Sequence, residues 1–468
     1  MNTIPTIAII GAGASGTLLA VQLAAQSTHP LHIALFDASG AFARGVAYGT
    51  HDPSHLLNVT ANRMGAFEDR SDDFYRWLLA HEAQWRSLHA AFAALKVTPT
   101  SFMPRMIYGT YLESLLQAAQ TNKQARIERV KAEVTDAEAT SQSIILTLVD
   151  GAKREADRLA LAIGNLPAHP FGFTKTLSHS DRYIGHIWSP PQNSVLSRTD
   201  FRDDDTPVFI IGTGLTTIDA VVSLRAKGYK GRIIAVSRHG LLPQPHMLPI
   251  ASYPRFLPPE HAPRTALELI RAIREEVTRA QKEGTDWRSV IDTLRADTPA
   301  LWRQLSEEER RKLLRVLSYW STHRHRMPQE SAAMIAGEVN TGTLEIIAGS
   351  IRHIEESEAR LIVQVRLRES GEVRSIEAGH VLNCSGPDTN IARSANALLL
   401  NLYKQGIIEQ GPLAMGIAVS DDYSVKGNAA GRVFALGPLL AGERLETIAM
   451  PEIRAQAANA AHTLLSSL

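Results

Sequence analysis

The feature that most constrains the fold is a glycine-rich turn set between an apolar strand and an apolar helix. The apolar run Thr6–Ile10 predicts a strand buried on both faces. Residues 11–16, with the sequence GAGASG, follow directly, and residues 17–25 predict a buried helix. A second strand is expected over residues 33–37. This order of strand, turn, helix and strand predicts a dinucleotide-binding βαβ unit.

The polar and small residues of this unit predict a site for FAD. Gly11 permits the tight turn, Gly13 lets the backbone approach a pyrophosphate, and Gly16 lets helix and strand pack closely. Ser15 lies in the same turn, at a helix N-terminus whose free N–H groups and dipole favour phosphate. Asp37 ends the second strand, where a carboxylate can accept hydrogen bonds from a ribose.

The same pattern returns in the middle of the chain. Residues 208–211 predict a strand, residues 212–217 (GTGLTT) form the turn, residues 218–226 predict a helix, and residues 233–237 predict the next strand. Thr217 stands where the first unit has its third glycine, which weakens the motif. The chain is therefore expected to contain two dinucleotide folds.

The two units differ in charge at one equivalent position. Asp37 follows Gly11 by 26 residues, and Arg238 follows Gly212 by the same 26 residues. A carboxylate suits a free ribose hydroxyl, whereas a guanidinium can bind a 2′-phosphate through two hydrogen bonds. The first unit therefore predicts FAD and the second NADPH. The alternative is that Arg238 is only a solvated surface residue. The predicted NADPH-site residues are Gly212, Gly214, Thr216, Ser237, Arg238 and His239.

The rest of the chain supplies weaker signals. Residues 160–165 and 381–387 are similar strand-then-glycine segments that could return the chain past a cofactor. Apolar residues at helical spacing predict a helical insertion over residues 261–335. This insertion contains the basic run 323–326, which could equally be a solvated helix end. A final helix over residues 447–465 could point its N-terminus at a flavin or serve only for packing.

Composition narrows the class of protein. With 49 Lys and Arg against 48 Asp and Glu, the chain gives no general reason to expect nucleic acid or an anionic membrane as partner. The single cysteine, Cys384, excludes an intrachain disulfide, a redox-active cysteine pair and a metal site built on several cysteines, and no metal is expected. The apolar N-terminus lacks a basic leader and is interrupted by glycines, so a signal peptide is not expected. We therefore expect a cytoplasmic protein without a membrane span.

Nearly end to end, the chain also resembles a known family, the FAD-NAD(P)-binding proteins related to class B flavin monooxygenases. This family includes a flavin-dependent urate hydroxylase and N-hydroxylating enzymes that act on amino acids. The resemblance is carried by the segments 44–50, 55–59, 102–111, 163–165, 211–219, 237–243, 320–328, 436–440 and 446–456.

The resemblance implies further site residues. Candidates for the FAD site are Leu56, Asn58, Arg105, Gly164, Gly437 and Thr447. Candidates for binding an anionic substrate, such as urate or an amino-acid carboxylate, are Arg324, His325 and Arg326.

The expected architecture is an α/β protein with two Rossmann-like dinucleotide-binding domains and a helical insertion. The expected FAD-binding domain comprises residues 1–200 and 375–468, the NADPH-binding domain residues 201–260 and 336–374, and the insertion residues 261–335. The oligomeric state is left open.

The expected function is an NADPH-oxidising monooxygenase that uses FAD, O2 and a flavin C4a-hydroperoxide to hydroxylate a small polar or anionic substrate. Two alternatives stay open. One is an electron-transfer reductase that feeds a redox protein such as ferredoxin, and the other is a non-catalytic flavin-binding sensor.

Overall fold

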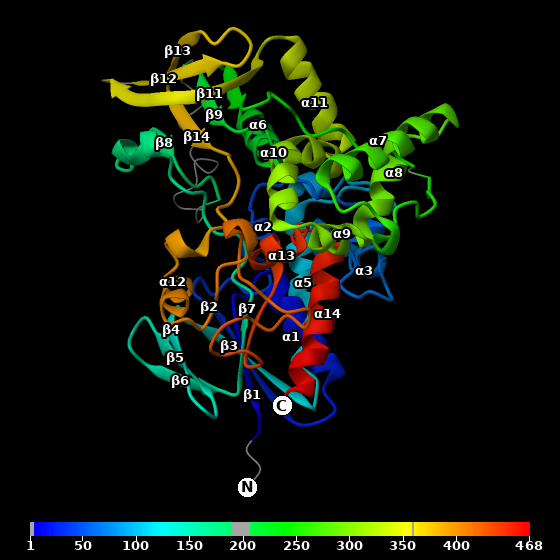
Figure 1. Ribbon diagram of the computed structural model, residues 1–468, viewed down its shortest axis with the longest axis vertical. Coiled ribbons are helices and arrows are strands. Elements are labelled where there is room, and N and C mark those ends of the chain that lie inside the picture. The colour runs from blue at the N-terminus through cyan, green and yellow to red at the C-terminus, as the bar shows by residue number, and fades with distance from the viewer. Residues whose placement is uncertain (1–3, 189–205, 250, 358–359) are drawn as a thin grey trace.

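The structure is a computed structural model that describes residues 4–188, 206–249, 251–357 and 360–468. Figure 1 shows two main sheets at opposite ends of the long axis, with the helices of the middle of the chain beside and between them. None of the helices in these described ranges is both long and apolar enough to cross a membrane. The α/β architecture predicted from the two glycine turns is confirmed.

The first sheet is a parallel sheet of five strands. Its order is β15-β7-β1-β2-β3, and each neighbouring pair is parallel. These strands are β1 (Thr6–Ile10), β2 (Leu31–Asp37), β3 (Ala125–Lys131), β7 (Arg158–Leu161) and β15 (Val433–Ala435). A small antiparallel sheet is inserted between β3 and β7 and consists of β4 (Val134–Ala139), β5 (Ile144–Leu148) and β6 (Lys153–Ala156).

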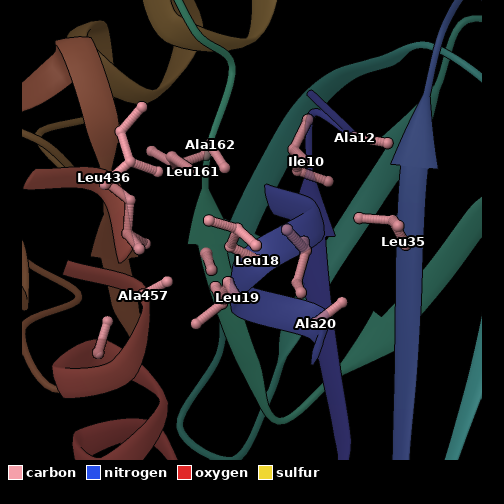
Figure 2. Close-up of a cluster of buried hydrophobic side chains, with 14 of the residues drawn as sticks. Ile10, Ala12, Leu18, Leu19, Ala20, Leu35, Leu161, Ala162, Leu436 and Ala457 are labelled. Carbon is pink, nitrogen blue, oxygen red and sulfur yellow. The ribbon is translucent and has the colours of Figure 1, made fainter. Parts of the chain in front are cut away.

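Three helices cover this first sheet or pack beside it. Helix α1 (Ala14–Gln26) follows β1, and it packs against α5 (Arg105–Ala119) and α14 (Met450–Ser466). Figure 2 shows how the apolar residues of α1 interlock with those of β1, β2, β7 and α14, among them Leu18, Leu35 and Ala457. The last helix of the chain is thus part of the first core, because its apolar face is buried on α1.

The second sheet has seven strands in the order β13-β12-β11-β10-β9-β14-β8. The strands from β11 to β8 in this order run parallel, whereas β11, β12 and β13 form an antiparallel extension. The strands are β8 (Tyr183–Ile184), β9 (Val208–Ile211), β10 (Ile233–Ser237), β11 (Leu344–Ser357), β12 (Arg360–Leu367), β13 (Val373–Ala378) and β14 (His380–Asn383).

The remaining helices include those of the predicted helical insertion. The side chains of Thr265, Asp286 and Ser306 cap three helices of the segment 261–335, which the sequence predicts to be helical. The helices not yet given are α2 (Gly45–Tyr48), α3 (Asp73–Ala80), α4 (Glu82–Arg86), α6 (Leu215–Ala226), α7 (Ala266–Lys282), α8 (Trp287–Thr293), α9 (Thr298–Gln304), α10 (Glu307–Arg324), α11 (Gln329–Asn340), α12 (Ala397–Lys404) and α13 (Ala441–Arg444).

The expected boundary at residues 374/375 can be compared with the sheets. This boundary, between the expected NADPH-binding and FAD-binding domains, falls inside β13. It therefore divides the second sheet, which also includes β14, ending at Asn383. Strand β8 also belongs to the second sheet, because it pairs with β14. The expected boundary at residues 200/201 lies outside the described residues.

Candidate cofactor sites and their junction

The first glycine turn opens onto a cavity of about 520 Å³, a size typical of cofactor and small-molecule sites. Its lining comes from the β1–α1 turn, the end of β2, the segment 44–55, the end of β7, Trp188 and the C-terminal segment. Five of the predicted FAD residues lie on this lining, namely Gly11, Gly13, Ser15, Asp37 and Gly164.

The backbone of the turn requires glycine at two positions. Gly11 has φ +100°, and a Cβ atom there would lie 2.4 Å from the carbonyl oxygen of Ala162. A Cβ atom on Gly16 would lie 1.9 Å from the carbonyl oxygen of Gly11. The turn can therefore approach β7, and α1 can approach the turn, only without side chains at these residues.

The N-terminus of α1 is suited to a pyrophosphate. Its N-cap, Gly13, supplies no capping side chain, and the first turn, which lies wholly within the described residues, carries no carboxylate. Ala14 and Ser15 of this turn lie on the cavity, so free backbone N–H groups and the positive dipole end are available there. Gly13 and Gly45 face one another across the lining, since a Cβ on Gly13 would lie 3.5 Å from the Cα of Gly45.

Asp37 is held in place at the end of β2. One carboxylate oxygen accepts a hydrogen bond from the N–H of Ala12 at 3.2 Å, and the other accepts from the N–H groups of Ser39 at 2.9 Å and Gly40 at 3.1 Å. The hydroxyl of Ser39 also donates to Oδ1, so that oxygen is saturated, whereas Oδ2 accepts only from Ala12 among the described residues and can still accept from a ribose hydroxyl. The residues around this cavity therefore fit FAD.

Other predicted FAD residues connect the two folds instead of lining this cavity. Arg105 donates from Nε to the carbonyl oxygen of Leu56 at 2.9 Å, and it forms an ion pair of 2.9 Å with Asp219 on α6. The carbonyl oxygen of Asn58 bonds to Nε2 of His246 at 3.0 Å. Leu56, Asn58 and Arg105 thus lie at the junction between the first fold and the second.

The two predicted residues of the C-terminal segment lie close to the cavity. A Cβ on Gly437 would lie 2.7 Å from Oγ of Ser15, and the N–H of Gly437 donates to the side chain of Gln456 at 2.8 Å. Thr447 is buried, and the next residue, Ile448, lies on the lining.

A polar network at the junction was not among the predicted site residues. Thr50 bonds to Nδ1 of His55 at 2.8 Å, Nε2 of His55 bonds to Oγ of Ser223 at 2.7 Å, and Ser223 donates to Asp52 at 2.6 Å. Because Ser223 gives its only proton to Asp52, His55 must donate from Nε2. Thr50, Asp52 and His55 lie on the cavity, whereas Ser223 belongs to α6 of the second fold.

The two titratable residues of this network, His55 and Asp52, differ in charge near neutral pH. Burial lowers the pKa of His55, although the charges of Asp219 and Asp52 oppose that effect. Burial acts to raise the pKa of Asp52, but the charge of His55 and hydrogen bonds from Ser223 and Ser54 outweigh it, so the pKa of Asp52 is lowered. Near neutral pH the network therefore holds a neutral imidazole and a carboxylate.

The second glycine turn repeats the geometry of the first. Gly212 has φ +109°, and a Cβ there would lie 2.5 Å from the carbonyl oxygen of Cys384, the counterpart of Ala162. The hydroxyl of Thr217 donates to the carbonyl oxygen of Gly212 at 2.9 Å, so the residue that departs from the motif satisfies its hydroxyl within the turn. The N-cap of α6, Gly214, has no capping side chain, and the half-buried Thr216 lies in the first helical turn.

The end of β10 carries the predicted basic residues. Ser237 accepts a hydrogen bond from the N–H of Gly240 at 3.0 Å. Its hydroxyl donates to Thr213 at 2.8 Å, because Thr213 gives its only proton to the carbonyl oxygen of Leu241 at 2.6 Å. Arg238 and His239 lie on a second cavity, of about 380 Å³. Burial and then the charges of Arg368 and Arg238 lower the pKa of His239.

In the basic run 323–326 of the insertion, both arginines form ion pairs with other residues of the protein. Arg324 is buried and binds Glu446 through Nη2 at 2.8 Å and Nε at 3.1 Å. Arg326 is also buried and pairs with Asp292. Burial lowers the pKa of His325 to about 4. None of these three candidates lines the FAD cavity, and their role in binding a substrate stays a prediction.

The half-buried imidazole of His246 leads to a prediction on pH. Its Nδ1 has no hydrogen-bond partner among the described residues, and burial and then the charge of Arg326 lower its pKa to about 4 from the ordinary 6.5. Between these values the unfolded chain binds more protons than the folded one, so stability falls as pH falls through this window. We expect His246 to account for a loss on the order of 1 to 3 kcal/mol at the acid end.

The His246→Gln variant checks this expectation, because glutamine keeps an N–H donor for Asn58 but does not titrate. Thermal or urea unfolding of both proteins from neutral pH to about pH 4 should show a flatter pH dependence for the variant. Parallel curves would mean that His246 titrates normally in the folded protein.

The comparisons with known proteins agree with this geometry. Residues 8–166 match a protein family described as FAD-NAD(P)-binding. No curated protein matches the chain significantly.

Solved structures match over the whole length. The reduced form of an ornithine hydroxylase from Pseudomonas aeruginosa aligns with TM-score 0.64 and 16% identity over 99% of this chain and 100% of that one. A Kutzneria sp. 744 ornithine N-hydroxylase with reduced FAD, NADP+ and L-ornithine aligns with TM-score 0.63 and 13% identity over 99% of both chains. A bacillithiol disulfide reductase from Staphylococcus aureus aligns with TM-score 0.58 and 12% identity over 100% of this chain and 99% of that one.

At these identities the structural matches establish the fold. Residues 8–166 match the FAD-NAD(P)-binding family, and the chain as a whole has the fold shared by the ornithine hydroxylases and the disulfide reductase.

Proposed function

We propose that the protein is an FAD-dependent, NADPH-oxidising monooxygenase that hydroxylates a small polar or anionic substrate, urate-like or amino-acid-like. The observation that carries the proposal is that one chain has two glycine turns, each followed by a helix whose N-terminus lacks a capping side chain. The first turn lies beside the carboxylate of Asp37, and the second lies beside Arg238.

The residues of this chain have distinct roles in the proposal. Gly13 and the N-terminus of α1 hold the pyrophosphate of FAD, and Asp37 accepts from its ribose. Gly214 and the N-terminus of α6 hold the pyrophosphate of NADPH, and Arg238 donates hydrogen bonds to its 2′-phosphate. When bound, FAD accepts a hydride from NADPH and activates O2 for insertion of one oxygen atom into the substrate.

The insertion is fixed to the C-terminal segment. Nε1 of Trp302 donates to the carbonyl oxygen of Gly442 at 2.8 Å, and Nε1 of Trp320 donates to Glu446 at 3.2 Å. With the Arg324–Glu446 pair, these bonds hold the insertion against the C-terminal segment that borders the FAD cavity. A monooxygenase must protect its oxygen chemistry from water, and in this proposal the insertion contributes by holding that segment in place.

The single cysteine argues against thiol chemistry within this chain. Cys384 is buried, and burial raises the pKa of its thiol well above the ordinary value. A reactive cysteine needs an accessible thiolate. The fold shared with a disulfide reductase therefore does not extend to a cysteine-based mechanism in this protein.

The substrate is proposed from the fold and from the basic run together. Because Nε and Nη2 of Arg324 already bind Glu446, Arg326 is the better candidate for an anionic substrate group. Its Nε and Nη1 have no hydrogen-bond partner among the described residues. An amino-acid carboxylate or the urate anion could supply one.

Turnover by the purified flavin-loaded protein tests the proposal. NADPH and O2 consumption would be followed with urate, ornithine and lysine, and products would be analysed by mass spectrometry. A monooxygenase accelerates NADPH oxidation with one compound and adds one oxygen atom to it. Oxidation that requires an added redox protein such as ferredoxin would favour the reductase, and an absence of any NADPH oxidation would favour the sensor.

A further inference from the structure

The second cavity contains four arginines, only one of which belongs to the glycine-turn unit. Arg238 follows β10, whereas Arg352 comes from β11, Arg366 is the residue before the last one of β12, and Arg368 lies just beyond that strand. No carboxylate is part of the described lining, which also includes His239, Gly349, Ser350, Leu367 and Gly371.

The hairpin of β11 and β12 directs its arginines to one face. Leu361, Val363 and Val365 are buried in an apolar cluster, so the alternation of a strand puts Arg366 on the opposite face. Arg352 lies at a β-bulge, because Ile351 pairs with Val365 and His353 pairs with the adjacent Gln364. A bulge changes the direction of a side chain, and Arg352 lies on the cavity.

Arg368 joins the hairpin to the end of β10. Its Nη1 donates to the carbonyl oxygen of Arg238 at 3.1 Å and also contacts Nδ1 of His239. The hairpin is therefore fixed against the segment that would bind the nicotinamide dinucleotide.

The charges of this cluster are uncompensated. Among the described residues, Arg238, Arg352, Arg366 and Arg368 form no ion pair within 4.0 Å, whereas other arginines of the same sheet do. Arg360 pairs with Glu377 at 2.6 Å, and Arg374 pairs with Glu345 at 2.6 Å. Like charges around one cavity repel each other, and a bound dianion would relieve that repulsion.

We propose that the β11–β12 hairpin completes the 2′-phosphate site of the second dinucleotide fold, with Arg352 and Arg366 acting as specificity-determining residues together with Arg238. This inference rests on the proposed use of NADPH. The hairpin, and not only the arginine after β10, then selects a 2′-phosphorylated dinucleotide over the unphosphorylated one.

Calorimetric titration with adenosine 2′,5′-bisphosphate and with 5′-AMP tests this role, because the two ligands differ only in the 2′-phosphate. The double variant Arg352→Ala/Arg366→Ala should bind the bisphosphate at least about tenfold more weakly and bind 5′-AMP unchanged. Arg360→Ala is the matched control on the same hairpin, and its affinities should equal those of the natural protein. FAD content and thermal unfolding show whether the variants remain folded.

Equal affinities of the double variant and the natural protein for the bisphosphate would overturn the inference, as would an equal loss for both ligands. The proposed function fails separately, if NADPH does not reduce the flavin of the natural protein. A natural protein that is reduced by NADPH but whose hairpin variants bind the bisphosphate normally would refute the hairpin's role alone.

Discussion

Replacing Gly13 by alanine is expected to give a folded protein that binds FAD at least about 100-fold more weakly. Gly13 has an extended backbone with φ −72°, which alanine adopts, and the added Cβ would meet only Gly45, at an ordinary 3.5 Å. The methyl group would nevertheless stand between the turn and the cavity, where the pyrophosphate must approach the backbone. Flavin content after purification and fluorescence titration with added FAD measure the loss.

Two other glycine-to-alanine variants serve as comparisons for this prediction. Gly337→Ala, on α11, adds a methyl group in open space and should keep its FAD. Gly16→Ala places a Cβ 1.9 Å from the carbonyl oxygen of Gly11 and should destabilise the fold itself. A Gly13→Ala protein that keeps its flavin and its affinity would show that the turn is not the pyrophosphate site.

Replacing Arg238 by alanine is expected to weaken NADPH binding by about 100-fold, or about 2.7 kcal/mol, and to leave NADH binding nearly unchanged. The guanidinium is exposed on the second cavity, and among the described residues it forms no ion pair, so its main expected partner is the 2′-phosphate. Rapid-reaction measurements of flavin reduction at varied NADPH and NADH concentrations give the two apparent dissociation constants.

The NADPH affinity of the Arg238→Ala variant is compared with that of a conservative variant. Arg238→Lys keeps the charge but loses the planar two-pronged geometry, so it should recover only part of the NADPH affinity. If Arg238→Ala weakened both nucleotides equally, the phosphate would have to lie elsewhere.

The local parts of the fold were predictable because each lies in one short stretch of sequence. The strands at Thr6–Ile10, Val208–Ile211 and Ile233–Ser237 have the predicted bounds. Apolar runs next to glycine turns leave few alternatives to buried parallel strands.

The junction between the folds could not be predicted in this way. His55 bonds to Ser223, 168 residues away, and Arg105 pairs with Asp219, 114 residues away. Such contacts depend on how two separately folded sheets meet, which no periodicity records. The resemblance singled out Arg105 for the flavin site, whereas its hydrogen bonds in the structure go to Leu56 and Asp219.

The arginine cluster escaped prediction for a related reason. Arg352 and Arg366 lie on an exposed hairpin whose charged residues look ordinary in sequence, and the bulge at Arg352 has no sequence signature. The parallel pairing of β10 with β11 and the hydrogen bond of Arg368 to Arg238 bring this hairpin to the end of the second glycine-turn unit.

The central claim is that one chain binds FAD at its first glycine turn and NADPH at its second, so that the nucleotide reduces the flavin. Anaerobic titration of the purified protein with NADPH, followed through the visible absorbance of the flavin, tests it most directly. We predict a yellow protein with one FAD per chain that is bleached by about one equivalent of NADPH. A protein that takes up no FAD, or whose bound flavin stays oxidised in excess NADPH, would contradict the claim.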